Sequence, residues 1–255
     1  MNHRVSILMF LGVIALLFDV NVASQAPSQS PDKPLYQLTG TETAIVGTIG
    51  VNGPIPKARR IDMAADPICI SLNDKPETES FITNDDRLVN VFVYVKSEFI
   101  SAHRFQPPDS AVTIERRNCR YSPHVLGLRV GQTLSIVNLD PTQHNTHPTP
   151  RLNQEWNLTQ VPQGEPVRQK FSREEVLIPF KCNQHPWEKA YVGVVDHPFF
   201  AVSDRFGNFE IRGVPAGTHT LVVWHEELGS QEVEISVSPN ETRRADFTFD
   251  SNKKR

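Results

Sequence analysis

Short apolar runs recur along the chain from residue 44 onwards, and turn residues separate one run from the next. The clearest runs are 44–51, 88–96, 124–130 and 133–138, where Val, Ile and Leu alternate with polar residues or follow one another. With 20 prolines and 13 glycines, the chain has frequent breaks in any longer pattern. About a dozen such runs and no convincing amphipathic helix predict an all-β fold built from β-sandwiches.

The first 24 residues have the pattern of a secretory signal peptide. Basic residues precede an apolar run over 5–18, and 22–24 supply small residues for cleavage. The alternative, an uncleaved membrane anchor, is disfavoured because Asp19 ends the apolar run short of a comfortable span. We therefore expect an exported protein, periplasmic or extracellular, without a membrane span after signal removal.

Composition indicates what lies outside the predicted sandwiches and which partners to expect. Residues 25–43 are rich in Pro, Ser, Gln and Thr and are predicted to be a flexible linker, and 250–255 form a solvated tail. Residues 57–86 are polar and irregular. The 26 basic and 29 acidic residues are evenly mixed and give a net charge of −3, so no nucleic-acid partner is expected.

The three cysteines have different expected roles in an exported protein. In an oxidising compartment two of them should pair, and one is left over. Cys182 has His185 three positions after it, which makes it the candidate for a free thiol. By elimination, Cys69 and Cys119 are the disulfide candidates.

Cys182 and His185 share one short stretch, and His144 follows an apolar strand farther upstream. One thiolate with two imidazoles is the donor set that suits an electron-transfer copper ion. Such a site takes one histidine from the end of a strand and the Cys and His from a tight loop. The sequence therefore predicts a metal site, with copper as the metal and zinc as the alternative.

Residues 111–196 resemble the first half and the ligand loop of a cupredoxin, the plastocyanin-like blue-copper fold. The resemblance rests on LRVGQTLSIVNLD (128–140) with the histidine after it, and on FKCNQH (180–185). It implies that His144, Cys182 and His185 are the equatorial copper ligands.

The chain departs from the cupredoxin pattern at the axial position. No methionine follows residue 63, and Glu188 stands where the axial methionine is expected. As a ligand, this carboxylate would stabilise Cu(II) and lower the reduction potential, or favour zinc or a non-blue copper site. The alternative is a surface Glu188 that points to solvent. His147 is a further candidate ligand, and its alternative is an ordinary hydrogen-bonding loop histidine.

The stretch AVSDRFGNFEIRGVPAGTHTL (201–221) is similar to the later half of the carboxypeptidase regulatory-like, transthyretin-type sandwich. The earlier half is found at 46–56 and 89–95. We therefore hypothesise one sandwich made of 44–100 and 197–249, with a cupredoxin-like domain, 101–196, inserted in it. The alternative is two sequential domains, 44–196 and 197–249.

Together the two resemblances imply two Greek-key β-sandwiches, a combination typical of exported bacterial "methylamine utilization"-type proteins, a label to which no reaction is attached. The expected function is an exported mononuclear copper protein that transfers electrons to a redox protein partner or holds copper. An enzyme is not expected, because no catalytic constellation is visible. The alternatives are a metal-free adhesion or ligand-binding sandwich, and an enzyme with an open copper or zinc position that uses His147 or Glu188.

Overall fold

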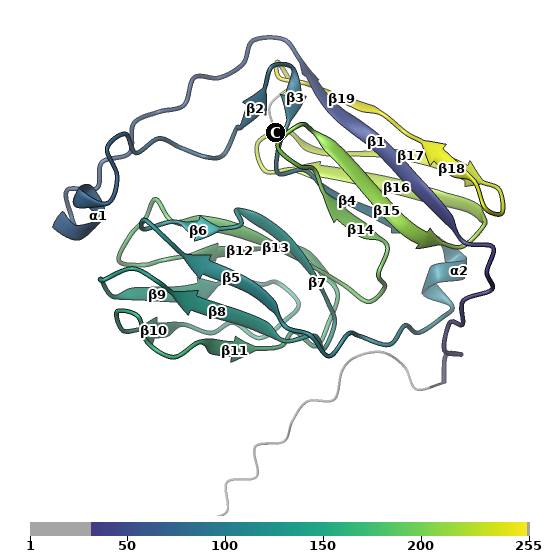
Figure 1. The fold of residues 1–255 in the computed structure, drawn as a ribbon, viewed down its shortest axis with the longest axis horizontal. Coiled ribbons are helices and arrows are strands. Elements are labelled where there is room, and N and C mark those ends of the chain that lie inside the picture. The colour runs from purple at the N-terminus through teal and green to yellow at the C-terminus, as the bar shows by residue number, and fades with distance from the viewer. Residues whose placement is uncertain (1–31, 254–255) are drawn as a thin grey trace, which may run out of the picture.

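The computed structural model describes residues 32–253, and the predicted signal peptide lies outside the described residues. Two β-sandwiches lie side by side, with two short helices outside them (Figure 1). The all-β prediction is confirmed. Within residues 32–253, no helix is long and apolar enough to cross a lipid bilayer.

The first sandwich is built from both ends of the chain. Its larger sheet contains β1 (Thr43–Asn52), β2 (Thr83–Asn84), β3 (Arg87–Leu88), β15 (Asn208–Val214), β18 (Thr242–Arg244) and β19 (Phe247–Asp250). Its second sheet has the order β14 (Phe200–Val202), β4 (Phe92–Lys96), β16 (Gly217–His225), β17 (Gly229–Val237). Alternating apolar residues of both sheets, such as Ile45, Val93 and Leu221, are fully buried in the core between them.

Strands from the two ends of the chain are neighbours in this sandwich. β1 pairs antiparallel with β15 and parallel with β18 and β19, while β4 lies between β14 and β16. In Figure 1 the purple β1 runs beside the green β15 and the yellow β19. We therefore propose the discontinuous division, 44–100 with 197–249, in place of two sequential domains.

The second sandwich is formed by the middle of the chain. Its five-stranded sheet has the order β10 (Leu158–Gln160), β9 (His144–Pro148), β12 (Glu175–Lys181), β13 (Lys189–Val195), β7 (Val125–Arg129). Its four-stranded sheet has the order β11 (Val167–Gln169), β8 (Leu134–Asn138), β5 (Val112–Arg116), β6 (Tyr121–Ser122). Ile114, Ile136, Phe180 and Val192 belong to the buried core between these sheets.

The two sandwiches meet where an aromatic ring of one lies on glycines of the other. Gly127 and Gly193 are paired across β7 and β13, and the Phe92 ring of β4 lies directly against both. A Cβ atom would come within 2.4 Å of the ring at Gly193 and 2.8 Å at Gly127. Only glycine permits this close approach, so these two positions fix how tightly the sandwiches pack.

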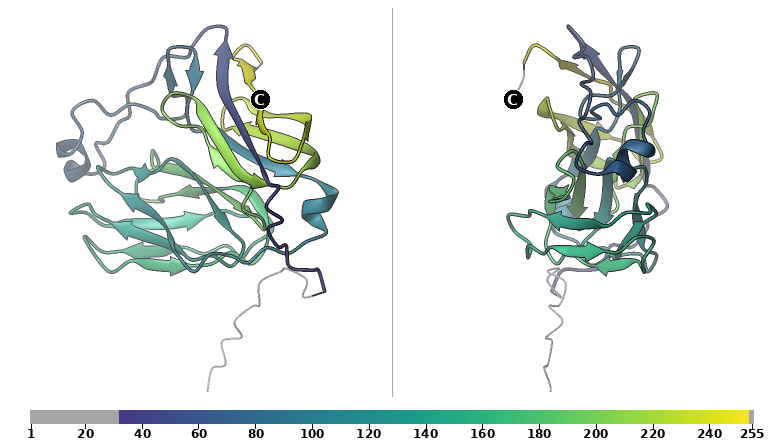
Figure 2. Two further views of the ribbon diagram at one scale, coloured as in Figure 1. Left: turned by 45° about the vertical axis from the view of Figure 1, so that its right-hand side comes forward. Right: turned by 90° about the vertical axis from the view of Figure 1, so that its left-hand side faces the viewer.

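A long connection between β1 and β2 leaves the first sandwich and reaches one end of the second (Figures 1 and 2). It carries the one-turn helix α1 (Pro67–Ser71). Asp66 is the N-cap, and its Oδ1 accepts from the backbone N–H groups of Ile68 and Cys69. The region expected to be irregular therefore contains a helix, because a capping carboxylate followed by Pro67 favours a helix start.

Parts of the expected linker and tail are held in place. Leu35 forms a parallel bridge with Arg104, and the Tyr36 ring packs at 5.3 Å from that of Phe105. Ser251 is buried and donates its N–H to the carbonyl of Asn52. Tyr36, which lies within the stretch 25–43 predicted to be a flexible linker, thus has apolar contacts on the first sandwich.

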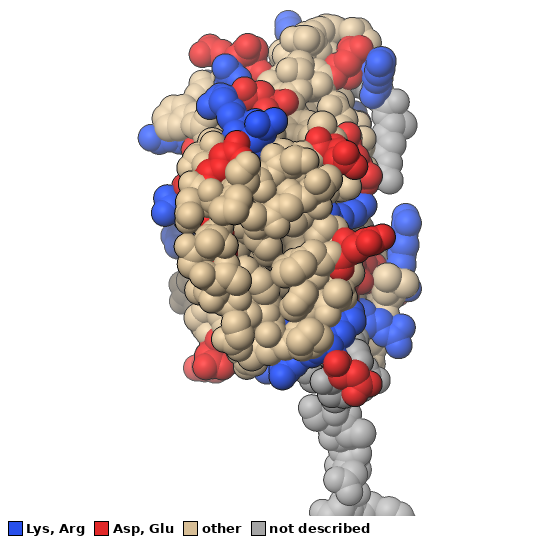
Figure 3. All heavy atoms as spheres, turned by 90° about the vertical axis from the view of Figure 1, so that its right-hand side faces the viewer, with Lys and Arg blue, Asp and Glu red and all other residues tan. Residues whose placement is uncertain are grey.

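The second helix, α2 (Glu98–Ser101), lies after β4 on the same side of the first sandwich as this N-terminal segment. On the face shown in Figure 3, basic and acidic side chains lie close together in the upper part, and much of the middle carries neither. This face has no continuous basic stripe of the kind that follows a phosphate backbone.

The buried histidines of this fold should make stability depend on pH. Burial, together with the positive charge of Arg129, lowers the pKa of His197 to about 3, and burial lowers that of His225 to about 4. Both pKa values return to the ordinary 6.5 in the unfolded chain. Below pH 6.5 the unfolded chain therefore binds protons that the folded protein excludes. The free energy of unfolding should fall by up to about 1.4 kcal/mol per pH unit for each histidine.

Urea unfolding of the metal-free protein at about pH 7 and about pH 5 tests this expectation. His197→Asn should reduce the loss of stability between the two pH values, whereas His103→Asn, at a partly exposed site, should leave it unchanged. An unaltered pH dependence in His197→Asn would contradict the assignment.

Candidate metal centre

The register of three neighbouring strands brings the predicted donors to one end of the second sandwich. β12 lies between β9 and β13, with Lys181 opposite His147 of β9 and opposite Lys189 of β13. His144 begins β9, while Cys182, His185 and Glu188 lie in the short loop between β12 and β13. The sheet therefore places a strand start and a tight loop side by side.

Four potential ligand atoms converge at this end, and all of them are buried. The Nδ1 atoms of His144 and His185 are 2.9 Å apart, and Cys182 Sγ is 3.6 Å from His185 Nδ1. Glu188 Oε1 is 2.8 Å from His144 Nδ1 and 3.1 Å from His185 Nδ1. The four residues have exposed fractions of 0–3%. Bonds of about 2.0–2.3 Å from a shared ion hold its ligand atoms about 3–4 Å apart, so this spacing fits a metal site.

Glu188 does not point to solvent but into the cluster. Its Oε1 atom is buried close to both imidazoles, yet no donor among residues 32–253 is aligned for a hydrogen bond to it. A buried carboxylate oxygen without a hydrogen bond is costly unless a cation compensates it. The common focus of this oxygen, two ring nitrogens and one sulfur is where an ion would provide that compensation.

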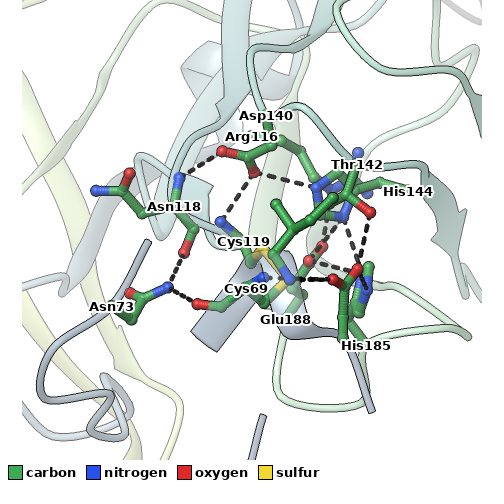
Figure 4. The surroundings of a disulfide bond; sticks show 12 residues. Cys69, Asn73, Arg116, Asn118, Cys119, Asp140, Thr142, His144, His185 and Glu188 are labelled. Carbon is green, nitrogen blue, oxygen red and sulfur yellow. Dashed lines mark hydrogen bonds and ion pairs between the residues drawn. A yellow bond between two sulfur atoms is a disulfide. The ribbon is translucent and has the colours of Figure 1, made fainter. Parts of the chain in front are cut away.

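The outer edges of both imidazoles are held by carboxylates. His144 Nε2 lies 3.0 Å from Asp140 Oδ2, and His185 Nε2 lies 3.1 Å from Asp66 Oδ2. A carboxylate that accepts from Nε2–H leaves the Nδ1 lone pair for a metal and fixes the ring orientation. The backbone N–H of Asn145 also points at Cys182 Sγ, at 3.4 Å. Figure 4 shows His144 in contact with Asp140 on one side and close to Glu188 and His185 on the other.

Arg116 is buried beside the cluster and neutralises Glu188. Its Nε donates to Glu188 Oε2 at 2.8 Å, and both side chains are fully buried. The remaining guanidinium N–H groups donate to Gln160 Oε1, the Asn145 carbonyl and the Tyr121 hydroxyl. One carboxylate oxygen is thus used by Arg116, while the other faces the donor cluster.

The electrostatics of the cluster favour charged forms despite burial. Burial alone lowers the pKa of His144, but its contacts with Asp140, Cys182 and Glu188 raise it to about 10. In the same way, contacts with Cys182 and Glu188 outweigh burial and raise the pKa of His185 to about 9. Burial raises the pKa of Cys182 and Glu188, and the contacts with both histidines lower it by more. Without metal the cluster therefore favours a thiolate and a carboxylate facing two protonated imidazoles, and a bound cation would displace the protons on both Nδ1 atoms.

Two further histidines lie outside the cluster. His147 contacts Glu155 through Nε2 at 2.6 Å and Asn183 through Nδ1 at 3.0 Å, so the structure does not bring this candidate to the other donors. His124 Nε2 is 2.5 Å from Glu226 of the first sandwich.

Cys69 and Cys119 form a disulfide that ties the α1 connection to the second sandwich.

Sequence reasoning missed Asp66 and Arg116. Asp66 had one local indication, its place before a proline at a helix start. Arg116 had none, because an arginine at the end of a strand is ordinarily exposed.

Comparisons with known proteins found one matching family model and several solved structures that are similar to part of the chain. Residues 183–250 match the family model of the carboxypeptidase regulatory-like domain. This match begins before the predicted boundary at 197 and includes β13, which pairs within the second sandwich. The search of curated proteins gave no match.

Solved structures similar to the chain include cupredoxins. A purple cupredoxin from Nitrosopumilus maritimus is 25% identical over 34% of this chain and 99% of its own, with a TM-score of 0.29. Amicyanin from Paracoccus versutus is 18% identical over 40% of this chain and 96% of its own, with a TM-score of 0.30. A Cu-containing nitrite reductase from Thermus scotoductus SA-01 is 21% identical over 35% of this chain, with a TM-score of 0.31, and the match spans 25% of that enzyme.

Substitution of Arg116 tests how far its positive charge stabilises the buried Glu188 carboxylate. Arg116→Leu leaves a buried carboxylate without its cation, so the metal-free protein should lose about 3–5 kcal/mol of unfolding free energy. Arg244→Leu, which removes one partner of the exposed pair with Asp246, should cost less than about 1 kcal/mol. Urea unfolding measures the loss of unfolding free energy in both variants. Adding Glu188→Gln to Arg116→Leu should recover part of the loss; no recovery would show that Arg116 acts through packing alone.

Proposed function

We propose that the protein is an exported mononuclear copper protein that transfers electrons, with His144, Cys182, His185 and Glu188 as the copper ligands. The observation that carries this proposal is the buried convergence of four donor atoms, one of them a Glu188 oxygen without a hydrogen bond. The Cys69–Cys119 disulfide supports an oxidising compartment, in agreement with the expected export.

The donor types favour copper. A thiolate is a soft ligand, and a Cys with two His is the set found in electron-transfer copper sites. The carboxylate of Glu188 is harder than the thioether usual at an axial position, so it stabilises Cu(II) relative to Cu(I). We therefore expect a low reduction potential and a non-blue spectrum. Zinc, the alternative, is also suited to four N, O and S donors but has no redox chemistry.

Electron transfer fits this site better than catalysis. All four donors come from the protein and are buried, so no coordination position faces a cleft where a substrate could enter. The imidazoles are fixed by Asp140 and Asp66, and the strands of the second sandwich fix their backbone positions. A rigid ligand set lets copper change oxidation state with little reorganisation. The implied partner is a redox protein that receives or supplies the electron.

Copper loading of the mature protein tests the proposal. One copper ion per chain should bind and give an intense thiolate-to-copper absorption in the visible range. Cys182→Ser should abolish this band because it removes the sulfur donor, while His147→Gln should keep it. A protein that binds no copper, or an unchanged band in Cys182→Ser, would refute the assignment. Added azide should leave the spectrum unchanged, whereas a shifted spectrum would favour an open enzyme site.

Substitution of Glu188 tests the fourth ligand. Glu188→Gln keeps the shape and an oxygen donor but removes the charge, so the reduction potential should rise and the visible band should shift. Glu155→Gln removes a carboxylate from a partly exposed contact with His147 and should change neither. Protein-film voltammetry and the visible spectrum give both readings. Equal potentials in wild type and Glu188→Gln would place this carboxylate outside the coordination sphere.

A further inference from the structure

The outer edge of His185 is covered by a segment that does not belong to the second sandwich. Asp66, whose Oδ2 lies 3.1 Å from His185 Nε2, is part of the long connection between β1 and β2. His185 follows β12 in the second sandwich, and the two residues are 119 positions apart. Asp66, from a connection of the first sandwich, therefore covers a candidate ligand, His185, of the second sandwich.

Asp66 is fixed from several directions. Its Oδ1 caps α1 through the N–H of Ile68 at 2.8 Å, and its Oδ2 accepts from Thr142 Oγ1 at 2.7 Å as well as facing His185. Its side chain is 14% exposed and that of His185 only 4%. The carboxylate thus both orients the imidazole and separates it from solvent.

The disulfide fastens this arrangement to the second sandwich. Cys69 lies in α1, three residues after Asp66, and is bonded to Cys119. The backbone N–H of Cys119 donates at 2.8 Å to Asp140 Oδ2, the same oxygen that faces His144. Figure 4 shows the disulfide next to this chain of contacts. The disulfide therefore joins the helix that Asp66 caps to the turn whose N–H group binds Asp140, and these two carboxylates lie behind the two candidate histidine ligands.

Other contacts close the same surface. Asn73 donates from its side chain to the carbonyl groups of Cys69 and Asn118. The indole N–H of Trp187 donates to the Cys119 carbonyl, and its ring lies 5.1 Å from that of His185. Met63 is buried against the disulfide. Residues 61–73 are termed the cover segment below. They are attached to the second sandwich through Asp66 before α1, Cys69 within α1 and Asn73 after it.

Building on the function proposed above, we propose that the cover segment closes the copper site at His185, and that Asp66 is its positioning residue. The carboxylate holds the Nε2 edge, and the disulfide keeps the segment in place. Exchange of the metal with solvent then requires the segment to move away. A merely structural role of the segment would alter stability without altering metal exchange or the reactivity of His185.

Asp66→Ser separates positioning from capping. Serine is an equally good N-cap, so α1 is retained, but its side chain is too short to reach His185. Transfer of Cu(II) from the loaded protein to excess EDTA should become about 10–100-fold faster than in wild type. The loss of the visible band measures this rate. Asp66→Asn, which keeps the length and an acceptor oxygen, should recover most of the wild-type rate. Asp62→Ser, at an exposed residue that binds only the N–H of Ala64, should match wild type.

The second variant, Cys69→Ser with Cys119→Ser, tests the tether. It should release copper faster than wild type, in the same direction as Asp66→Ser. In metal-free protein, diethyl pyrocarbonate should modify His185 at least about 10-fold faster in both variants, as read by peptide mass spectrometry. The reason is that the contact with Asp66 controls access of the reagent to Nε2 of His185. His103 in the first sandwich serves as the internal reference, since the cover segment does not contact it.

The outcomes separate this inference from the proposed function. If wild type binds copper but Asp66→Ser and the cysteine variant release it at the wild-type rate, the cover is overturned and the copper site remains. If wild type binds no copper yet His185 becomes reactive in both variants, the copper function fails and the cover remains. Unchanged reactivity of His185 in metal-free Asp66→Ser would also overturn the role of Asp66.

Discussion

The buried ion pair between Arg116 and Glu188 is the interaction on which the chemistry of the candidate site depends. One oxygen receives a hydrogen bond from the buried Arg116, and the other is directed at two imidazole nitrogens without a hydrogen bond. Without Arg116 a carboxylate at this depth would carry a large desolvation penalty. The contacts with His144 and His185 keep Cys182 as a thiolate beside this carboxylate, and two anionic ligands so close together favour a bound cation.

The site is assembled from both sandwiches, although its four donors all come from one. The strands around β12 bring His144 beside the loop of Cys182 and His185. The connection between β1 and β2 then supplies Asp66 from outside. This division separates two tasks, since the second sandwich presents the donors and the disulfide-bound segment orients and encloses one of them. The two sandwiches also touch directly where Phe92 packs on Gly127 and Gly193.

Local patterns were sufficient for the strands and for the residues with unusual chemistry. Alternating apolar residues predicted the long strands, because a half-buried strand needs one apolar face. A lone thiol beside His185, with His144 at a strand end, singled out three residues that the structure brings together. Glu188 remained ambiguous, because a glutamate followed by a lysine looks like a surface residue in any local pattern. Arg116 was missed for the same reason, since its buried partners lie far away in the sequence.

The sequence by itself determined the all-β character, the free thiol and the chemical identity of the candidate donors, because strand periodicity and ligand type are properties of neighbouring residues. Only the tertiary structure decided that Glu188 is turned inward, that His147 stays outside, and that Asp66 lies behind His185. These outcomes depend on strand register, on burial and on a cross-link between distant segments. Such features arise from contacts between residues that local periodicity cannot pair.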